Sequence, residues 1–182
     1  MLLSSRLLLR GLNEADLNSR YVSWLNDQEV NRFLETRFVP QTLTSIHHYW
    51  LTHRDDASSP WFAICLRCDS KHIGNIKLGP IDWIHRKADV SLFIGDKSYW
   101  GKGYGEESIR LITSWAFNDL NLEKLTAGIY SANLASRRTF EKCGFLLEGT
   151  LRQEIFSCGK RQDIFRMGQL RSDYENHKAS NC

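Results

Sequence analysis

Three glycines at alternate positions form the segment with the clearest chemical use. They are Gly101, Gly103 and Gly105, and they follow a predicted strand and open a predicted helix. Glycine lets successive backbone N–H groups turn toward one point, where a phosphate can accept hydrogen bonds from them. The helix N-terminus adds its positive dipole end, and Lys102 adds a mobile charge. The spacing fits neither the P-loop nor the dinucleotide fingerprint, so it predicts either another kind of phosphate site or an ordinary turn.

A second polar segment, residues 133–145, reads as a short helix. Asn133 is a candidate N-cap, and its amide could instead bond a ligand. Ser136 and Phe140 lie within about one turn of each other on that helix, and Gly144 is a suitable residue to end it. Taken alone, the segment is equally compatible with an ordinary capped amphipathic helix.

The remaining pattern supplies the elements that position these two segments. Short apolar or alternating runs predict strands, and apolar residues at helical spacing predict helices, giving the order β-α-α-α-β-β-β-α-β-α-β-β. The expected strands are 7–10, 61–66, 73–78, 90–94, 125–130, 145–148 and 164–170. Asn13 is expected to cap the first helix, and a second short helix is expected over 30–34. The chain, residues 1–182, is therefore expected to be one mixed α/β domain with a polar, frayed tail from about Ser172.

Composition excludes several classes of protein. The chain has 182 residues, 24 Lys and Arg against 21 Asp and Glu, and 12% aromatic residues. A nearly neutral chain without a basic stripe is not expected to bind nucleic acid. Aromatic content argues against disorder, and no apolar stretch approaches the ~20 residues of a membrane span. With no recognisable signal peptide, the expected location is the cytoplasm.

The five cysteines form no metal pattern. Cys65 and Cys68 are spaced as C-x-x-C, but a structural zinc site needs a second pair of ligands that the sequence lacks. We therefore expect buried or edge cysteines and no metal, with metal or redox chemistry at this pair as the alternative.

Together, the two polar segments resemble the GNAT superfamily of acyl-CoA-dependent N-acetyltransferases, over nearly the whole chain. The motifs that show this resemblance are Gly101–Gly105, Asn133-x-x-Ser136 and residues 140–145 (FEKCGF). A likeness to the RimJ/RimL-type branch rests on residues 100–105 (WGKGYG) and on Glu148-Gly149-x-x-Arg152. The resemblance implies a mostly antiparallel sheet of six to seven strands, splayed at the acyl-CoA site and flanked by helices. A homodimer is compatible with it.

The resemblance also implies that acetyl-CoA is the co-substrate and that the amine attacks its thioester directly. No cysteine nucleophile is then needed. Residues implied to contact the cofactor are Leu92, Phe93, Ile94, Trp100, Gly101, Lys102, Gly103, Tyr104, Gly105, Asn133, Ser136 and Arg138. One departure is Phe140, where many relatives place a tyrosine that protonates the departing thiolate.

Direct attack requires a neutral amine, so a base or a water relay must remove a proton. Asp89 matches the strand position where relatives carry a glutamate and is the leading candidate. His85, whose unperturbed pKa suits the task, and Glu148 are alternatives. Ser136 is the best substitute acid in place of the missing tyrosine. A surface carboxylate with no role is the alternative reading of Asp89.

The acceptor side is less defined. Residues 21–37 look similar to the helix pair of acetyltransferases that act on nucleotide-linked amino sugars, with Asn26, Glu35 and Arg37 placed to face a polar acceptor. A solvated helix face is the alternative. The favoured function is acetylation of a small amine such as a nucleotide-linked amino sugar. The alternatives are N-terminal acetylation of a protein and, from another class, a non-catalytic acyl-CoA sensor.

Overall fold

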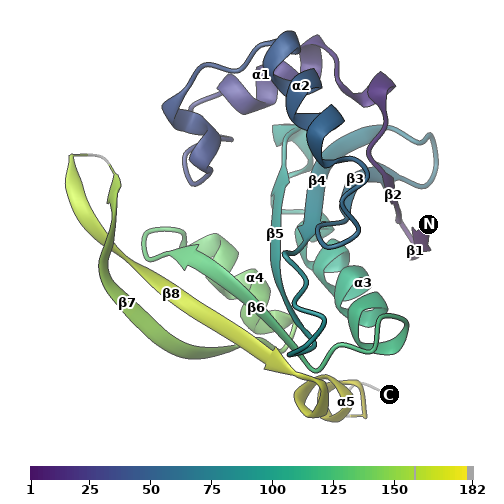
Figure 1. Cartoon of the computed structure of the whole chain (residues 1–182), viewed down its shortest axis with the longest axis vertical. Helices are drawn as coiled ribbons and strands as arrows, with labels where there is room; N and C mark the ends of the chain where they lie inside the picture. The colour runs from purple at the N-terminus through teal and green to yellow at the C-terminus, as the bar shows by residue number, and fades with distance from the viewer. Residues whose placement is uncertain (158, 180–182) are drawn as a thin grey trace.

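A single eight-stranded sheet organises the computed structural model, which describes residues 1–157 and 159–179. The strand order is β1-β2-β3-β4-β5-β6-β8-β7, and every pair is antiparallel except β5 with β6 (Figure 1). The strands are β1 (Leu2–Leu3), β2 (Leu7–Gly11), β3 (Trp61–Leu66), β4 (His72–Leu78), β5 (Lys87–Ile94), β6 (Lys124–Tyr130), β7 (Leu146–Ser157) and β8 (Lys160–Leu170). The predicted mixed α/β fold is confirmed, with one strand more than expected because β1 is only two residues long.

Helices pack on both faces of this sheet. They are α1 (Ser19–Asn26), α2 (Leu43–His53), α3 (Tyr104–Asn118), α4 (Leu134–Lys142) and α5 (Arg171–Ala179), with short 3-10 turns η1 (Glu14–Asp16), η2 (Glu35–Phe38) and η3 (Lys97–Tyr99). The main core lies between the sheet and α3, where Ile109, Ile112 and Phe117 are fully buried. A smaller cluster around Trp24 packs α1 against the other side.

The N-terminal helices differ in detail from the prediction. Asn13 begins only the 3-10 turn η1, whereas Asn18 caps α1 by accepting from the N–H of Tyr21. The second short helix expected over 30–34 is absent from the described structure, which places η2 just beyond it, at Glu35–Phe38. A helix of this length is not stable through the helix propensity of its residues alone, so its formation depends on tertiary packing.

The C-terminal part is more ordered than its polar sequence suggested. The strands β7 and β8 form a long hairpin whose tip reaches toward the α1–η2 region (Figure 1). Within the described residues, the tail expected to fray from Ser172 instead forms α5 as far as Ala179, and Tyr174 of this helix packs against Phe117. Cys158 and Cys182 lie outside the described residues.

Candidate active site

The sheet opens between β5 and β6. These parallel strands pair only over Lys87–Asp89, opposite Lys124–Thr126, and then diverge (Figure 1). Beyond Asp89, β5 continues to pair with β4 as far as Ile94, so Leu92, Phe93 and Ile94 are held on one side only. Backbone groups on the side toward β6 are therefore available to an extended ligand, which would add to the sheet as a strand does.

The glycine-rich loop closes one end of this opening. The indole of Trp100 donates to the carbonyl of Ile94 at 2.8 Å, which ties the loop to the last residue of β5. Gly101 and Gly103 have φ of 71° and 80°, the left-handed region that favours glycine. Gly103 is the N-cap of α3.

The first turn of α3 leaves backbone donors free for an anion. The first hydrogen bond at this end runs from the N–H of Glu107 to the carbonyl of Gly103, at 3.0 Å. The N–H groups of Tyr104, Gly105 and Glu106 are consequently the orphan donors of the helix N-terminus. Such a terminus favours negative charge, as the pyrophosphate of an acyl-CoA carries.

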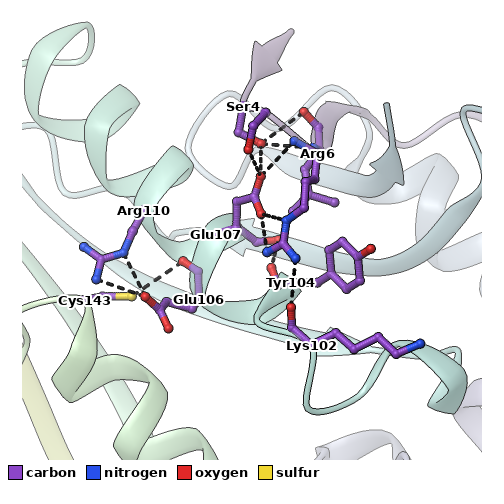
Figure 2. Close-up of polar contacts among 11 residues, drawn as sticks. Ser4, Arg6, Lys102, Tyr104, Glu106, Glu107, Arg110 and Cys143 are labelled. Carbon is purple, nitrogen blue, oxygen red and sulfur yellow. Dashed lines mark hydrogen bonds and ion pairs between the residues drawn. The ribbon is translucent and has the colours of Figure 1, made fainter. Parts of the chain in front are cut away.

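Arg6 holds the loop from outside. Its guanidinium contacts both sides of the first α3 turn: Nε lies 2.7 Å from Oε2 of Glu107, and Nη1 donates to the carbonyl of Lys102 at 3.0 Å (Figure 2). It also stacks on Tyr104, 4.5 Å from the ring centroid. Although burial opposes it, hydrogen bonds from Ser4 and Arg6 lower the pKa of Glu107. The N-terminal turn and the predicted phosphate loop therefore form one unit.

Lys102 extends away from this cluster (Figure 2), and its Nζ lies 5.7 Å from the centre of the Tyr99 ring. The side chain is free to reach an anion above the loop. The cofactor role of Lys102 stays a prediction, as does that of the loop as a whole.

The second predicted segment forms α4 as expected. Asn133 caps it by accepting from the N–H of Ser136, at 3.1 Å. Ser136 is thus in the first turn, and Arg138 is exposed on the same helix. Phe140 is only 2% exposed and packs edge-to-face on Phe145, so its ring belongs to the core and offers no proton donor.

The base candidate Asp89 lies where the two strands part. Its carboxylate accepts from the hydroxyl of Thr126 on β6 and pairs with Arg166 of β8, with Oδ1 3.0 Å from Nη2. The carboxylate is partly exposed, on the face of the sheet opposite α3. This position suits proton removal from an amine that approaches the opening.

The two alternative bases, His85 and Glu148, have other partners or surroundings. His85 is exposed on the turn before β5, four residues ahead of Asp89. Glu148 forms an ion pair with Lys124 at 2.6 Å, at the β7 irregularity between Leu147 and Gly149. Glu148 also lies over Gly168, the register partner of Thr126, so it is near the Asp89 contact as well. The choice of Asp89 over these two residues stays a prediction.

A tyrosine at the end of β6 joins two of the predicted acceptor residues. Tyr130 donates its hydroxyl to the carboxylate of Glu35, and Nη1 of Arg37 donates to the same hydroxyl at 3.0 Å. Burial and the neighbouring Glu35 raise the pKa of Tyr130. Sequence reasoning missed Tyr130. Its only signal was a tyrosine on the strand just before Asn133.

A cavity of about 470 Å³ adjoins this group. It lies between the residues that follow α1 and the tip of the β7–β8 hairpin, and Asn26, Arg37 and Ser157 are among the residues that line it. Asn26 spends its amide on the backbone, donating to Gln41 O at 2.8 Å and accepting from Gln41 N at 2.8 Å. Asn26 therefore forms part of the cavity wall, and both ends of its amide are already hydrogen-bonded to the backbone of Gln41.

The cysteines in the described residues contribute no obvious nucleophile. Burial raises the pKa of Cys143 to about 12, so its thiol stays protonated at neutral pH. Cys65 is buried, and burial raises its pKa as well, while Cys68 is exposed. Among residues 1–157 and 159–179, no three His, Cys, Asp or Glu side chains gather to hold a metal ion. Over the same residues, no helix combines the length and apolar character needed to cross a bilayer.

Comparison with known proteins identifies the family. A model of the acetyltransferase (GNAT) domain matches residues 6–146. Spermidine N(1)-acetyltransferase of Vibrio cholerae is 29% identical over 96% of this chain and 98% of its own, and the Escherichia coli K12 enzyme of that name is 30% identical over 91% and 87%. A crystal structure of the Vibrio cholerae enzyme with CoA and spermine covers 95% of this chain and 100% of its own, with 28% identity and a TM-score of 0.85.

These relatives give no support to the RimJ/RimL-type branch or to an amino-sugar acceptor, both of which the sequence motifs had suggested. The chain belongs to the GNAT acetyltransferase family and is an acyl-CoA-dependent N-acetyltransferase that uses acetyl-CoA.

Proposed function

We propose that this chain acetylates a primary amine of a small molecule by direct attack of the amine on the acetyl-CoA thioester. The observation that carries the proposal is the opening between β5 and β6, with Asp89 where the strands part and the orphan amides of α3 beyond its far end. The pyrophosphate would bind those amides, and the pantetheine arm would run beside Leu92, Phe93 and Ile94. The thioester would then meet an amine near Asp89.

In this mechanism Asp89 removes a proton from the attacking ammonium, directly or through a water molecule. Arg166 and Thr126 hold the carboxylate in place for that transfer. The thiolate that leaves must be protonated, and Ser136 in the first turn of α4 is the proposed donor, because Phe140 has no hydroxyl. No acyl-enzyme is formed, which agrees with the protonated state of Cys143.

Thiol release with acetyl-CoA and a panel of amines tests the proposal. The panel contains spermidine, which the names of the relatives suggest, a nucleotide-linked amino sugar, and a short peptide with a free N-terminus. Release with either small molecule but not with the peptide supports a small-molecule acceptor. Release with the peptide alone would support the protein N-terminal alternative. Binding of CoA without release on any amine would support the sensor.

A further inference from the structure

The cavity beside Tyr130 has a positive and polar lining. Its charged lining residues are Arg32 and Arg37. Asn31 and Ser157 of the hairpin are polar residues of the same lining. Within the part of the chain that the structure describes, none of its lining residues is acidic. A polyamine carries several positive charges, and bringing those charges beside two guanidinium groups costs free energy.

Arg37 lines this wall and has one nitrogen without a hydrogen-bond partner among the described residues. Its side chain is only 13% exposed, and Nη1 donates to the carbonyl of Leu34 at 2.7 Å and to the hydroxyl of Tyr130. Nη2 is buried and has no hydrogen-bond partner among the described residues. A guanidinium has five donors in a planar fork, and leaving a buried donor unmet is unfavourable. A carboxylate or phosphate that reaches Nη2 from the cavity would supply the acceptor that this nitrogen lacks, in a charge-assisted hydrogen bond.

Glu35 is the carboxylate that most favours a cationic acceptor here. Its Oε1 lies 3.9 Å from Nη1 of Arg37, but it already accepts the hydroxyl of Tyr130. Its side chain is largely exposed, and it is not one of the cavity-lining residues. Glu35 therefore balances part of the Arg37 charge and leaves the cavity itself without an acid.

We infer that the acceptor amine carries an oxyanion, a carboxylate or a phosphate, which Arg37 binds with support from Arg32. Arg37 also contacts Tyr130, the last residue of β6. An oxyanion on Arg37 therefore places the rest of the acceptor beside the opening where the amine must react. This inference rests on the proposed function and narrows its substrate class. It separates this chain from an enzyme selective for polyamines.

Two matched pairs of acceptors test the inference through kcat/KM for thiol release. The first pair is 1,4-diaminobutane and 4-aminobutyrate, in which a carboxylate replaces one terminal aminomethyl group. The second is glucosamine and glucosamine 6-phosphate. We expect the anionic member of at least one pair to be preferred by about tenfold or more, as a charge-assisted hydrogen bond provides. Which pair responds distinguishes a carboxylate from a phosphate.

The variant Arg37→Gln should lower kcat/KM for the preferred anionic acceptor by about tenfold or more and remove the preference within the pair. Arg54→Gln is the matched control, since Arg54 is exposed at the end of α2 and pairs with Asp55 outside the cavity. It should leave the preference intact. Preference for the diamine and spermidine, or a preference unchanged in Arg37→Gln, would overturn the inference.

Calorimetry separates failure of this inference from failure of the proposed function. Glucosamine and glucosamine 6-phosphate, and then the aminobutyrate pair, are titrated into CoA-loaded wild-type protein and Arg37→Gln. The inference is supported if the anionic member of a pair binds more tightly to the wild type and this difference is lost in Arg37→Gln. If no amine is acetylated in that case, the proposed function alone fails. Absence of any such difference in both binding and turnover refutes the inference.

Discussion

Arg166 reaches across β6 to Asp89. The arginine lies on β8 opposite Gly128, and its Nη2 is 3.0 Å from Oδ1 of Asp89 on β5. A Cβ built on Gly128 would lie 3.5 Å from Nη1 of Arg166, an ordinary van der Waals distance, so the guanidinium passes directly over this residue. The ion pair therefore links strands on either side of β6, at the place where β5 separates from it.

Asp89→Asn should lower kcat by about a hundredfold at neutral pH if Asp89 is the general base. The loss should shrink as pH approaches the pKa of the amine near 10, because the amine then deprotonates unaided. The pH dependence of kcat for wild type and variant measures this. Asp55→Asn, which removes an exposed carboxylate paired with an arginine, is the control. A variant whose loss is the same at every pH would exclude Asp89 as the base.

Arg6→Gln should weaken CoA binding by roughly tenfold, since it removes the ion pair with Glu107 and the hydrogen bond to the Lys102 carbonyl that fix the loop. The dissociation constant of CoA, measured by calorimetry, is the readout. Arg6 acts here as a positioning residue, so Glu107→Gln should produce a similar loss. An intact CoA affinity in both variants would show that the loop holds its shape without this contact.

Gly103→Ala should reduce both stability and CoA affinity. An alanine at φ of 80° is strained by about 1 kcal/mol or more, and its Cβ would lie 3.5 Å from Nη2 of Arg6, at the contact that holds the loop. Gly159→Ala is a matched control, because Gly159 has φ of 74° in the turn of the β7–β8 hairpin. Both variants should lose similar stability in urea unfolding. Only Gly103→Ala should weaken CoA binding, and equal affinities would argue against the phosphate loop.

Stability should fall on mild acidification because of the buried His72. Burial lowers its pKa, although Oδ1 of Asp16 lies 3.7 Å from Nδ1 and opposes that shift. Its Nε2 donates to the carbonyl of Gly74, and Nδ1 has no hydrogen-bond partner among the described residues. The folded chain thus binds fewer protons than the unfolded chain below pH about 6.5, and the free energy of unfolding decreases there as pH falls. Urea unfolding between pH 7.5 and 5 measures the slope. His72→Gln should flatten it, whereas His48→Gln, at an exposed position, should not.

A second decline should follow at lower pH. Although burial opposes ionisation of Asp16, the hydrogen bonds from Arg10 and from the N–H of Asn13 lower its pKa. The ionised Asp16 stabilises the fold above its ordinary pKa near 4, and that contribution is lost as pH falls through the folded value. Asp16→Asn should remove this acid-dependent loss while lowering stability at pH 7. Unfolding curves below pH 4.5 that match wild type would contradict this expectation.

Features held by local chemistry were predictable from the sequence. The helix α4, its cap at Asn133 and the left-handed Gly144 follow from neighbouring residues, as do the loop glycines. The acceptor side was harder, because it depends on contacts across long stretches of chain. Tyr130 meets Glu35 from 95 residues away, and only the folded sheet brings them together.

The length of the β7–β8 hairpin was missed for a related reason. Its distal residues, including Gln153, Glu154 and Arg161, are polar and mostly exposed, so they carry no alternating apolar signal. Pairing with the opposite strand, rather than burial, extends these strands to twelve and eleven residues.

That hairpin gives the enzyme a modular architecture. Its tip supplies Ser157 to one wall of the cavity, while the segment after α1 supplies the other, and neither belongs to the glycine-rich loop or to α4. Exchange of these two surface segments could therefore redirect the choice of amine while the cofactor machinery stays intact. Insertions, deletions and recombination at the hairpin tip would change the acceptor specificity while the rest of the fold is kept.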